Sequence, residues 1–195
     1  LLGVVLLAVA GGYGLLRASL PQLQGTRTLP GLSDTVRIDR DALGVPRIQG
    51  ATRLDVARAS GFLHAQERYF QMDLQRRVAA GELSELLGAG TYDIDARTRR
   101  HGFRAVARQV LQQQPAPLRD VLQAYVEGVN AGLAALSARP WEYQLLRIDP
   151  QPWQPEDSLL CIYTMWLDLQ DNDASIDRSL RALREATGEP GFAFI

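Results

Sequence analysis

The spacing of apolar and polar residues predicts a short β-hairpin near the start of the globular part of the chain. Residues 35–40 alternate apolar and polar side chains, as a half-buried strand does. Residues 41–44 have the composition of a turn, and residues 45–48 form a second short apolar run. Because Pro46 has no backbone N–H, we expect the second strand to lie at an edge or to begin beyond the proline.

Helical spacing dominates the rest of the chain. Thr52 and Asp55 are typical of a helix start, and Gly81 is typical of a helix end, so one long helix is expected between them, to about Ala80. Its expected apolar side consists of Ala59, Phe62, Leu63, Phe70, Leu74 and Val78. Further helices are expected over residues 82–87, 101–114, 117–136, 155–169 and 176–187, the last ended by Gly188. The pattern predicts a helix-rich α+β domain.

The first sixteen residues, LLGVVLLAVAGGYGLL, carry no charge. The run lies between the 7–15 residues typical of a signal-peptide core and the roughly 20 that span a membrane. Ala8-Val9-Ala10 has the small-x-small form of a signal peptidase site, whereas continuation to Leu16 favours an uncleaved anchor. We therefore divide the chain into a signal peptide or membrane anchor (1–16), a Pro- and Gly-containing linker (17–33) and a globular region (34–195).

Charge and cysteine usage exclude several classes of function. The 21 basic and 22 acidic residues are interleaved, so nothing indicates a nucleic-acid partner. The only cysteine, Cys161, excludes an internal disulfide and a Cys-rich zinc site. It lies within an apolar run and is interpreted as a small core residue.

No catalytic set is recognisable from spacing alone. The chain has no G-x-S-x-G or H-E-x-x-H motif, and its two histidines, His64 and His101, are far apart in sequence. An oxygen-rich group suits calcium but lacks EF-hand spacing, so a solvated loop is the alternative interpretation; it comprises Asp168, Asp171, Asn172 and Asp173.

An ordered series of motifs nevertheless resembles the penicillin acylase family of N-terminal-nucleophile hydrolases. Arg47 stands where this family most often has histidine. The matching segments, in order, are Val36–Asp41 with Gly44–Ile48, Gly61–Arg68, Tyr69–Asp73, Arg76-Arg77, Gly81–Gly88, Asp95 with Arg99-Arg100, Tyr125–Ala131 and Pro152–Ser158.

The resemblance implies a fold and a function. It implies the helix-rich α chain of an αββα sandwich, produced when an exported precursor cuts itself into an α chain, a spacer and a β chain. The β chain would begin with Ser, Cys or Thr, whose own α-amino group serves as the base. We therefore expect no catalytic residue here, a nucleophile downstream of Ile195, and the chain's own β chain as partner. The implied reaction is the cleavage of a linear N-acyl amide in the periplasm.

The resemblance also assigns candidate site residues. Met165 and Leu169 fall where the family lines its acyl pocket, with plain core packing as the alternative. Leu169 stands where phenylacetyl-specific members have an aromatic residue, and Asp168 stands at the gating position where they have arginine. The family's calcium glutamate aligns with Ser175, so a calcium ion would need a substitute such as Asp173.

A further set of motif residues is expected to build the scaffold and the α/β-chain interface. In this set, Arg76 or Arg77 is expected to pair with Glu85, because buried charges need partners. The set comprises His64, Gln66, Arg68, Gln71, Met72, Arg76, Arg77 and Glu85. Two other hypotheses remain: a membrane-anchored, non-catalytic binding or scaffold protein of the same fold, and a freestanding helical module.

Overall fold

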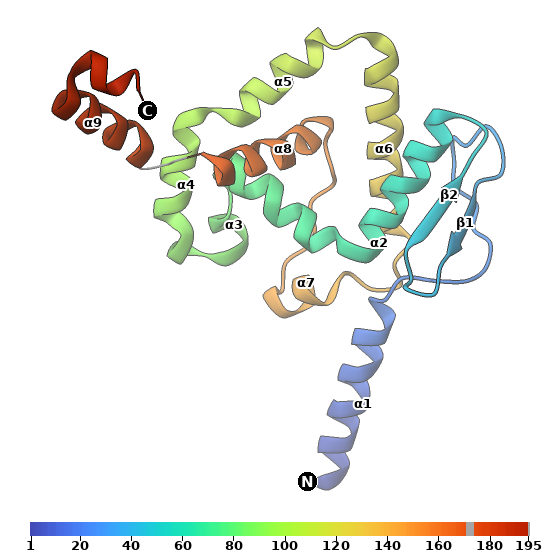
Figure 1. Cartoon of the computed structure of the whole chain (residues 1–195). Coiled ribbons are helices and arrows are strands. Elements are labelled where there is room, and N and C mark those ends of the chain that lie inside the picture. The colour runs from blue at the N-terminus through green and yellow to red at the C-terminus, as the bar shows by residue number, and fades with distance from the viewer. Residues whose placement is uncertain (171–173, 195) are drawn as a thin grey trace.

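A long central helix organises the chain, as the computed structural model shows for residues 1–170 and 174–194 (Figure 1). Asp173 and Ile195, named above, lie outside these described residues. The elements are α1 (Leu2–Ala18), β1 (Arg37–Arg40), β2 (Pro46–Gln49), α2 (Arg53–Ala80), α3 (Ser84–Leu87), η1 (Ala89–Thr91), α4 (Tyr92–Thr98), η2 (Arg99–His101), α5 (Phe103–Gln113), α6 (Ala116–Ala134), α7 (Trp141–Leu146), α8 (Pro155–Leu169) and α9 (Ser175–Phe192).

The predicted hairpin is confirmed. β1 and β2 pair antiparallel, with Arg37 opposite Gln49 and Arg40 opposite Pro46. The Asp41 carboxylate closes the turn by accepting hydrogen bonds from the backbone N–H groups of Leu43 and Val45, both at 2.9 Å. Pro46 is the first residue of its strand, a position where its missing N–H is tolerated.

α2 begins and ends where the sequence predicts. The Thr52 hydroxyl accepts from the Asp55 N–H at 3.1 Å, and Gly81 ends the helix in the left-handed conformation at φ 68°. α2 packs along α6 and α8 (Figure 1). At the α2–α6 crossing the backbones touch: a Cβ built on Gly128 would lie 1.9 Å from the Arg58 carbonyl oxygen. Only glycine fits at that position.

The buried side of α2 differs from the predicted one. Ala59 and Leu63 are buried, but Phe62, Phe70, Leu74 and Val78 are only half-buried. The core is built instead around Tyr69, Tyr143, Trp153, Val129 and Leu160. The difference arises because α2 has α6 and α8 as extended neighbours and smaller contacts with α4, α5 and β2, so no single stripe is buried.

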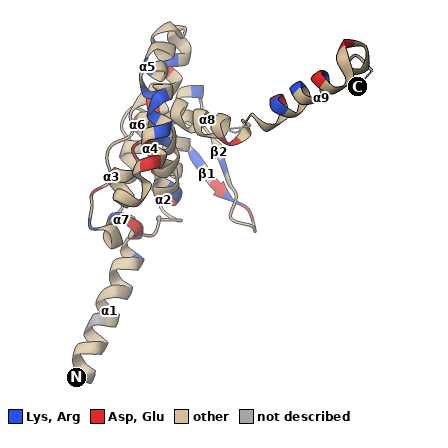
Figure 2. Ribbon diagram, turned by 90° about the vertical axis from the view of Figure 1, so that its left-hand side faces the viewer, with Lys and Arg blue, Asp and Glu red and all other residues tan. Residues whose placement is uncertain are grey.

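The first and last helices extend away from the body (Figures 1 and 2). α1 is exposed over most of its apolar side chains, and the backbone N–H of Ala138 donates to the Ala18 carbonyl oxygen at 3.2 Å. Among the described residues, no helix combines the length and hydropathy that a membrane crossing requires.

Two irregularities were not predicted from the sequence. The helix expected to end at Gly188 is only interrupted there, at φ 67° and ψ 174°, and α9 continues to Phe192. Glycine permits this conformation, and Pro190 starts the continuing turn without needing an intrahelical N–H partner. Arg68 breaks the helical backbone of α2 at φ −152° and ψ 32°.

Candidate functional site

The site is best described from helix α8, which carries Met165, Asp168 and Leu169. At its start, the Gln154 N–H donates to Asp157 Oδ2 at 2.7 Å, and Pro155 occupies the first helical turn. One side of α8 is buried against α2 through Asp157, Leu160 and Thr164. The Thr164 hydroxyl donates to the Gln75 carbonyl oxygen of α2 at 2.6 Å. The first half of the helix is therefore firmly held.

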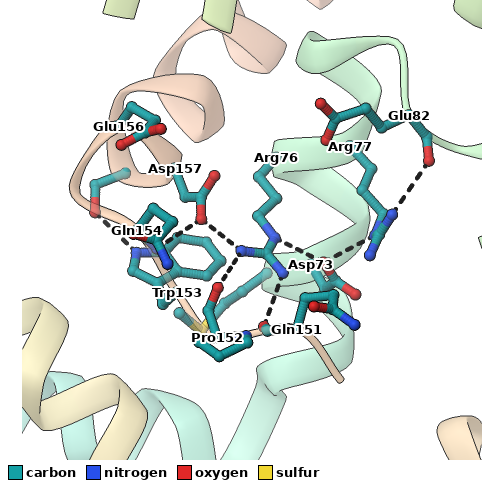
Figure 3. A network of polar contacts seen from close by, with 12 residues as sticks. Asp73, Arg76, Arg77, Glu82, Gln151, Pro152, Trp153, Gln154, Glu156 and Asp157 are labelled. Carbon is teal, nitrogen blue, oxygen red and sulfur yellow. Dashed lines mark hydrogen bonds and ion pairs between the residues drawn. The ribbon is translucent and has the colours of Figure 1, made fainter. Parts of the chain in front are cut away.

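A network of buried charges joins α2 to the start of α8 (Figure 3). Arg76 lies between two fully buried carboxylates and donates to Asp73 at 2.7 Å and to Asp157 at 2.5 Å. The same guanidinium donates to the carbonyl oxygens of Gln151 (2.9 Å) and Pro152 (3.0 Å) and lies 5.1 Å from the centroid of the Trp153 ring. Arg76 thus fixes the extended segment that leads into α8.

The outer part of the network extends this connection. Arg77 donates to Asp73 at 3.0 Å and to Glu85 at 2.8 Å, so the predicted pairing with Glu85 is made by Arg77. Arg104 of α5 donates to Asp157 at 3.0 Å. The Tyr143 hydroxyl donates to the second oxygen of Asp73 at 2.6 Å. Four helices, α2, α5, α7 and α8, therefore meet at two carboxylates.

Two groups of the network, Arg76 and Tyr143, have pKa values shifted by their buried surroundings. Burial alone would lower the pKa of Arg76, but the charges of Asp73 and Asp157 outweigh burial and raise it. Burial, reinforced by the Asp73 charge, raises the pKa of the Tyr143 hydroxyl above its ordinary value. The raised pKa values keep Arg76 charged and Tyr143 neutral near neutral pH, which suits a scaffold rather than acid–base chemistry.

The far end of α8 is exposed. Met165 and Leu169 lie one helical turn apart and are 61% and 76% exposed. Asp168 is exposed between them in sequence, and the Trp166 side chain is 47% exposed. Neither side chain is buried by the described residues, and the assignment of both residues to the acyl pocket stays a prediction beside the alternative of plain core packing.

The residues assigned to the scaffold divide into two groups. Gln66, Arg76 and Arg77, together with Met72, are buried against this chain's own elements. His64, Arg68, Gln71 and Glu85 are exposed. Arg68 lies 3.8 Å from Glu67, and the Gln66 amide donates to the Gly132 carbonyl oxygen at 3.4 Å. Contact of this set with another chain stays a prediction.

His64 and Cys161 line a cavity of about 580 Å³ between α2, α6 and α8. The His64 Nδ1 atom lies 2.9 Å from the Tyr125 hydroxyl, and burial lowers the pKa of the imidazole. Burial raises the pKa of the Cys161 thiol to about 11 and that of Tyr125 to about 12. The raised pKa favours the protonated thiol at neutral pH, whereas reactive cysteines have lowered pKa values.

The calcium hypothesis has no donor set within the described part of the chain. Among residues 1–170 and 174–194, no group of three or more His, Cys, Asp or Glu side chains could hold a metal ion. Ser175 begins α9, and its carbonyl oxygen accepts from the Ser179 hydroxyl at 2.7 Å. The proposed substitute, Asp173, lies outside the described residues, so the hypothesis stays untested.

Sequence reasoning missed the carboxylates at the centre of the network. Asp73 and Asp157 both lie in the motif segments, but the sequence predicts no partner for either carboxylate. No sequence motif or spacing indicates that Arg104 or Tyr143 binds these carboxylates. A useful clue was available in the run Asp73, Arg76 and Arg77, which places three charges at helical spacing on an otherwise buried helix.

The fold matches that of a solved protein chain. The structure matches that of a thermostable penicillin G acylase from Alcaligenes faecalis with a TM-score of 0.65, covering 82% of this chain and 88% of that chain at 24% identity. At this identity the match shows the fold: a helix-rich chain with one two-stranded hairpin.

The sequence comparisons show the family. A family model described as penicillin amidase matches residues 35–194. The chain is 46% identical to penicillin acylase 2 proenzyme of Pseudomonas sp. (strain SE83) over 144 residues, which is 74% of this chain. It is 33% identical to acyl-homoserine lactone acylase QuiP of Pseudomonas aeruginosa over 163 residues, or 81% of this chain.

The chain therefore belongs to the penicillin amidase family of N-terminal-nucleophile hydrolases, and its matched region corresponds to the α-subunit portion of penicillin acylase precursors. It spans about a fifth of the length of these curated relatives, 19% in both cases.

Proposed function

We propose that this chain is the α subunit of a self-processing amide hydrolase that cleaves a linear N-acyl amide to a carboxylic acid and an amine. The observation that carries the proposal is the exposed pair Met165 and Leu169 at the free end of α8, in a chain of the penicillin amidase family. The buried charge network holds the opposite end of this helix, so the pair projects from a rigid support.

The exposed side of α8 supports the presence of a larger partner. Ile162, Met165 and Leu169 follow the spacing i, i+3 and i+7, and all three are exposed. An apolar stripe of this kind normally packs against another element. The matched relative is about five times as long as the part of it that this chain covers. We propose that the rest of such a protein, as the β chain, covers this stripe.

In the proposed reaction, the nucleophile is the first residue of that β chain, downstream of Ile195. Its α-amino group, with an unperturbed pKa of about 7.7–8.0, takes the proton of the hydroxyl or thiol as the oxygen or sulfur attacks the acyl carbon. The C–N bond then breaks, and the leaving amine receives that proton. Water next hydrolyses the acyl-enzyme to the carboxylic acid. The present chain binds the acyl side chain and contributes no reacting group.

The pocket residues favour an aliphatic acyl group. Met165 and Leu169 offer a flexible thioether and a branched aliphatic side chain, without the aromatic surface of phenylacetyl-specific relatives. Asp168, at the gating position, adds a negative charge that disfavours acyl groups ending in a carboxylate.

The proposal extends to location and cofactor. Residues 1–16 act in export to the periplasm as a signal peptide or anchor, and residues 17–33 link them to the globular part. The uncharged, apolar sequence of residues 1–16 supports this role. A structural calcium ion near the start of α9 would use Asp173 in place of the family's glutamate, which aligns with Ser175.

The direct test is hydrolysis by the complete, self-processed protein. We expect it to release free amine from aliphatic N-acyl amides, and we expect replacement of the first β-chain residue by Ala to abolish release without unfolding the protein. A correctly processed protein that hydrolyses no N-acyl amide in a panel of acyl-homoserine lactones, β-lactams and simple anilides would refute the enzymatic function and favour the scaffold hypothesis.

A further inference from the structure

A cluster of aromatic rings lies at the end of α8, beside the proposed acyl pocket but not part of it. Trp166 packs edge-to-face on Phe103, with ring centroids 5.8 Å apart and planes at 85°. It makes a second edge contact with His101, at 6.4 Å and 78°. The His101 and Phe103 rings are themselves stacked, 4.9 Å apart at 10°. Tyr163, one turn earlier on α8, contacts Phe103 at 5.2 Å.

The position of this cluster matters because the buried residues of α8 end at Thr164, before the pocket residues. The buried side of the helix runs through Asp157, Leu160 and Thr164. After Thr164, Leu167 is half-buried, while Asp168, Leu169 and Gln170 are exposed. Within the described residues, the ring contacts of Trp166 with η2 and the start of α5 are the last aromatic contacts of this helix.

We infer that Trp166 is a positioning residue for acyl-group specificity: its contact with Phe103 and His101 fixes the final turns of α8, and thereby the places of Met165 and Leu169. The inference rests on the proposed function. Trp166 itself contacts the rings of α5 and η2, whereas Met165 and Leu169 are the residues proposed to touch substrate. The two pocket residues flank Trp166 on the same helix, so a shift of this tryptophan moves both of them.

Edge-to-face geometry makes the contact directional. Aromatic pairs at 4.5–7 Å prefer such arrangements, so the ring of Phe103 restricts both the distance and the rotation of Trp166. A site must hold its binding groups to within about 0.5 Å, and a displacement of about 1 Å can cost roughly 100-fold in rate. Loss of the Phe103 contact removes this restriction near the free end of the helix.

The test uses the complete, self-processed enzyme and a series of amides that share one amine and differ in acyl length from acetyl to decanoyl. We expect Trp166→Ala to lower kcat/KM for the preferred long acyl group about 10-fold or more, mainly through KM. We expect kcat/KM for the acetyl substrate, which is too short to fill the pocket, to stay within about twofold. Trp166→Phe retains a ring and should restore most of the preference.

Two further variants keep the test decisive. Phe103→Leu removes the ring partner without changing α8 and should shift the acyl preference in the same direction, so it carries the test if Trp166→Ala does not fold. Trp141→Ala, at a tryptophan of α7 that is 49% exposed and makes no ring contact among the described residues, should leave the preference unchanged.

The outcomes are distinguishable. Equal losses on acetyl and decanoyl substrates, or no change in the preference, would overturn the inference while leaving the proposed function intact. A processed wild-type protein that hydrolyses no member of the series would overturn the proposed function, and this inference with it.

Discussion

Arg76 and Asp157, 81 residues apart in the chain, form a buried ion pair with 2.5 Å between Nη1 and Oδ2. The pair ties the C-terminal end of α2 to the first turn of α8. Since Asp73 holds the same guanidinium from the other side, one positive charge lies between two buried negative charges. The orientation of the helix that carries the proposed acyl pocket therefore depends on this contact.

The first prediction concerns this pair. Asp157→Asn keeps the side-chain volume but removes a charge that faces Arg76 and Arg104. We expect the free energy of unfolding to fall by about 3 kcal/mol. This value is near the lower end of the range for breaking a buried ion pair, because Arg76 still pairs with Asp73. Urea denaturation of the complete protein measures it.

The matched control is Asp149→Asn, which breaks the exposed pair between Asp149 and Arg139. Exposed pairs contribute about 0–1 kcal/mol, so this variant should resemble the wild type. Equal effects of the two substitutions would contradict the central role given to the buried network.

A second prediction concerns the α2–α6 crossing. Gly128→Ala would place a methyl group 1.9 Å from the Arg58 carbonyl oxygen, a distance that backbone atoms cannot relieve without moving the helices apart. We expect the free energy of unfolding to fall by about 1–3 kcal/mol, the usual cost of overpacking. Gly90→Ala, where nothing lies within 4 Å of the added methyl group, is the control and should shift the melting temperature by little.

A third prediction concerns acid stability. Hydrogen bonds from the Ser33 hydroxyl and backbone N–H, and then from Thr52, lower the pKa of Asp55 to about 2 from 3.8. A lowered folded-state pKa contributes stability that is present above pH 3.8 and is lost as the pH falls toward 2. The difference in melting temperature between wild type and Asp55→Asn should therefore be largest above pH 4 and shrink toward pH 2.

The comparison for this pH series is Asp120→Asn, at an exposed carboxylate of α6. It should give a small difference without this trend. A difference for Asp55→Asn that stays constant from pH 5 to pH 2 would show that the Ser33 and Thr52 contacts do not depress the pKa of this carboxyl group.

A fourth prediction addresses the acyl pocket. Leu169→Phe adds the aromatic surface that the family resemblance assigns to this position in phenylacetyl-specific members. It should raise the ratio of kcat/KM for phenylacetyl over aliphatic amides about 10-fold. Leu145→Phe, at an exposed leucine of α7, controls for added surface aromaticity and should leave the ratio unchanged. An unchanged ratio in Leu169→Phe would place Leu169 outside the pocket.

Local signals predicted the elements of this fold well. Thr52 and Gly81 mark the ends of α2 because capping acts on the residues beside it in the chain. Asp41 and Pro46 likewise mark the turn and the second strand of the hairpin. The Pro155 helix start is equally local.

The partners of the buried charges could not be predicted from the same signals. Asp157 reaches Arg76 only after α2 and α8 pack, and helical spacing contains no information on a contact across 81 residues. The same limit applies to the buried side of α2, since its several neighbours are chosen by tertiary packing. The motif series indicated the family, but it did not assign Arg76 to Asp157 rather than to Glu85.

The central claim is that this chain is one part of a protein that cuts itself to expose a catalytic N-terminus. The most direct test is to express the complete protein and determine the N-terminal sequence and intact mass of every mature fragment. The account predicts a second, larger chain that begins with Ser, Cys or Thr and copurifies with a fragment containing α2 to α8. A single uncut chain, or a cut that exposes none of these three residues, would contradict it.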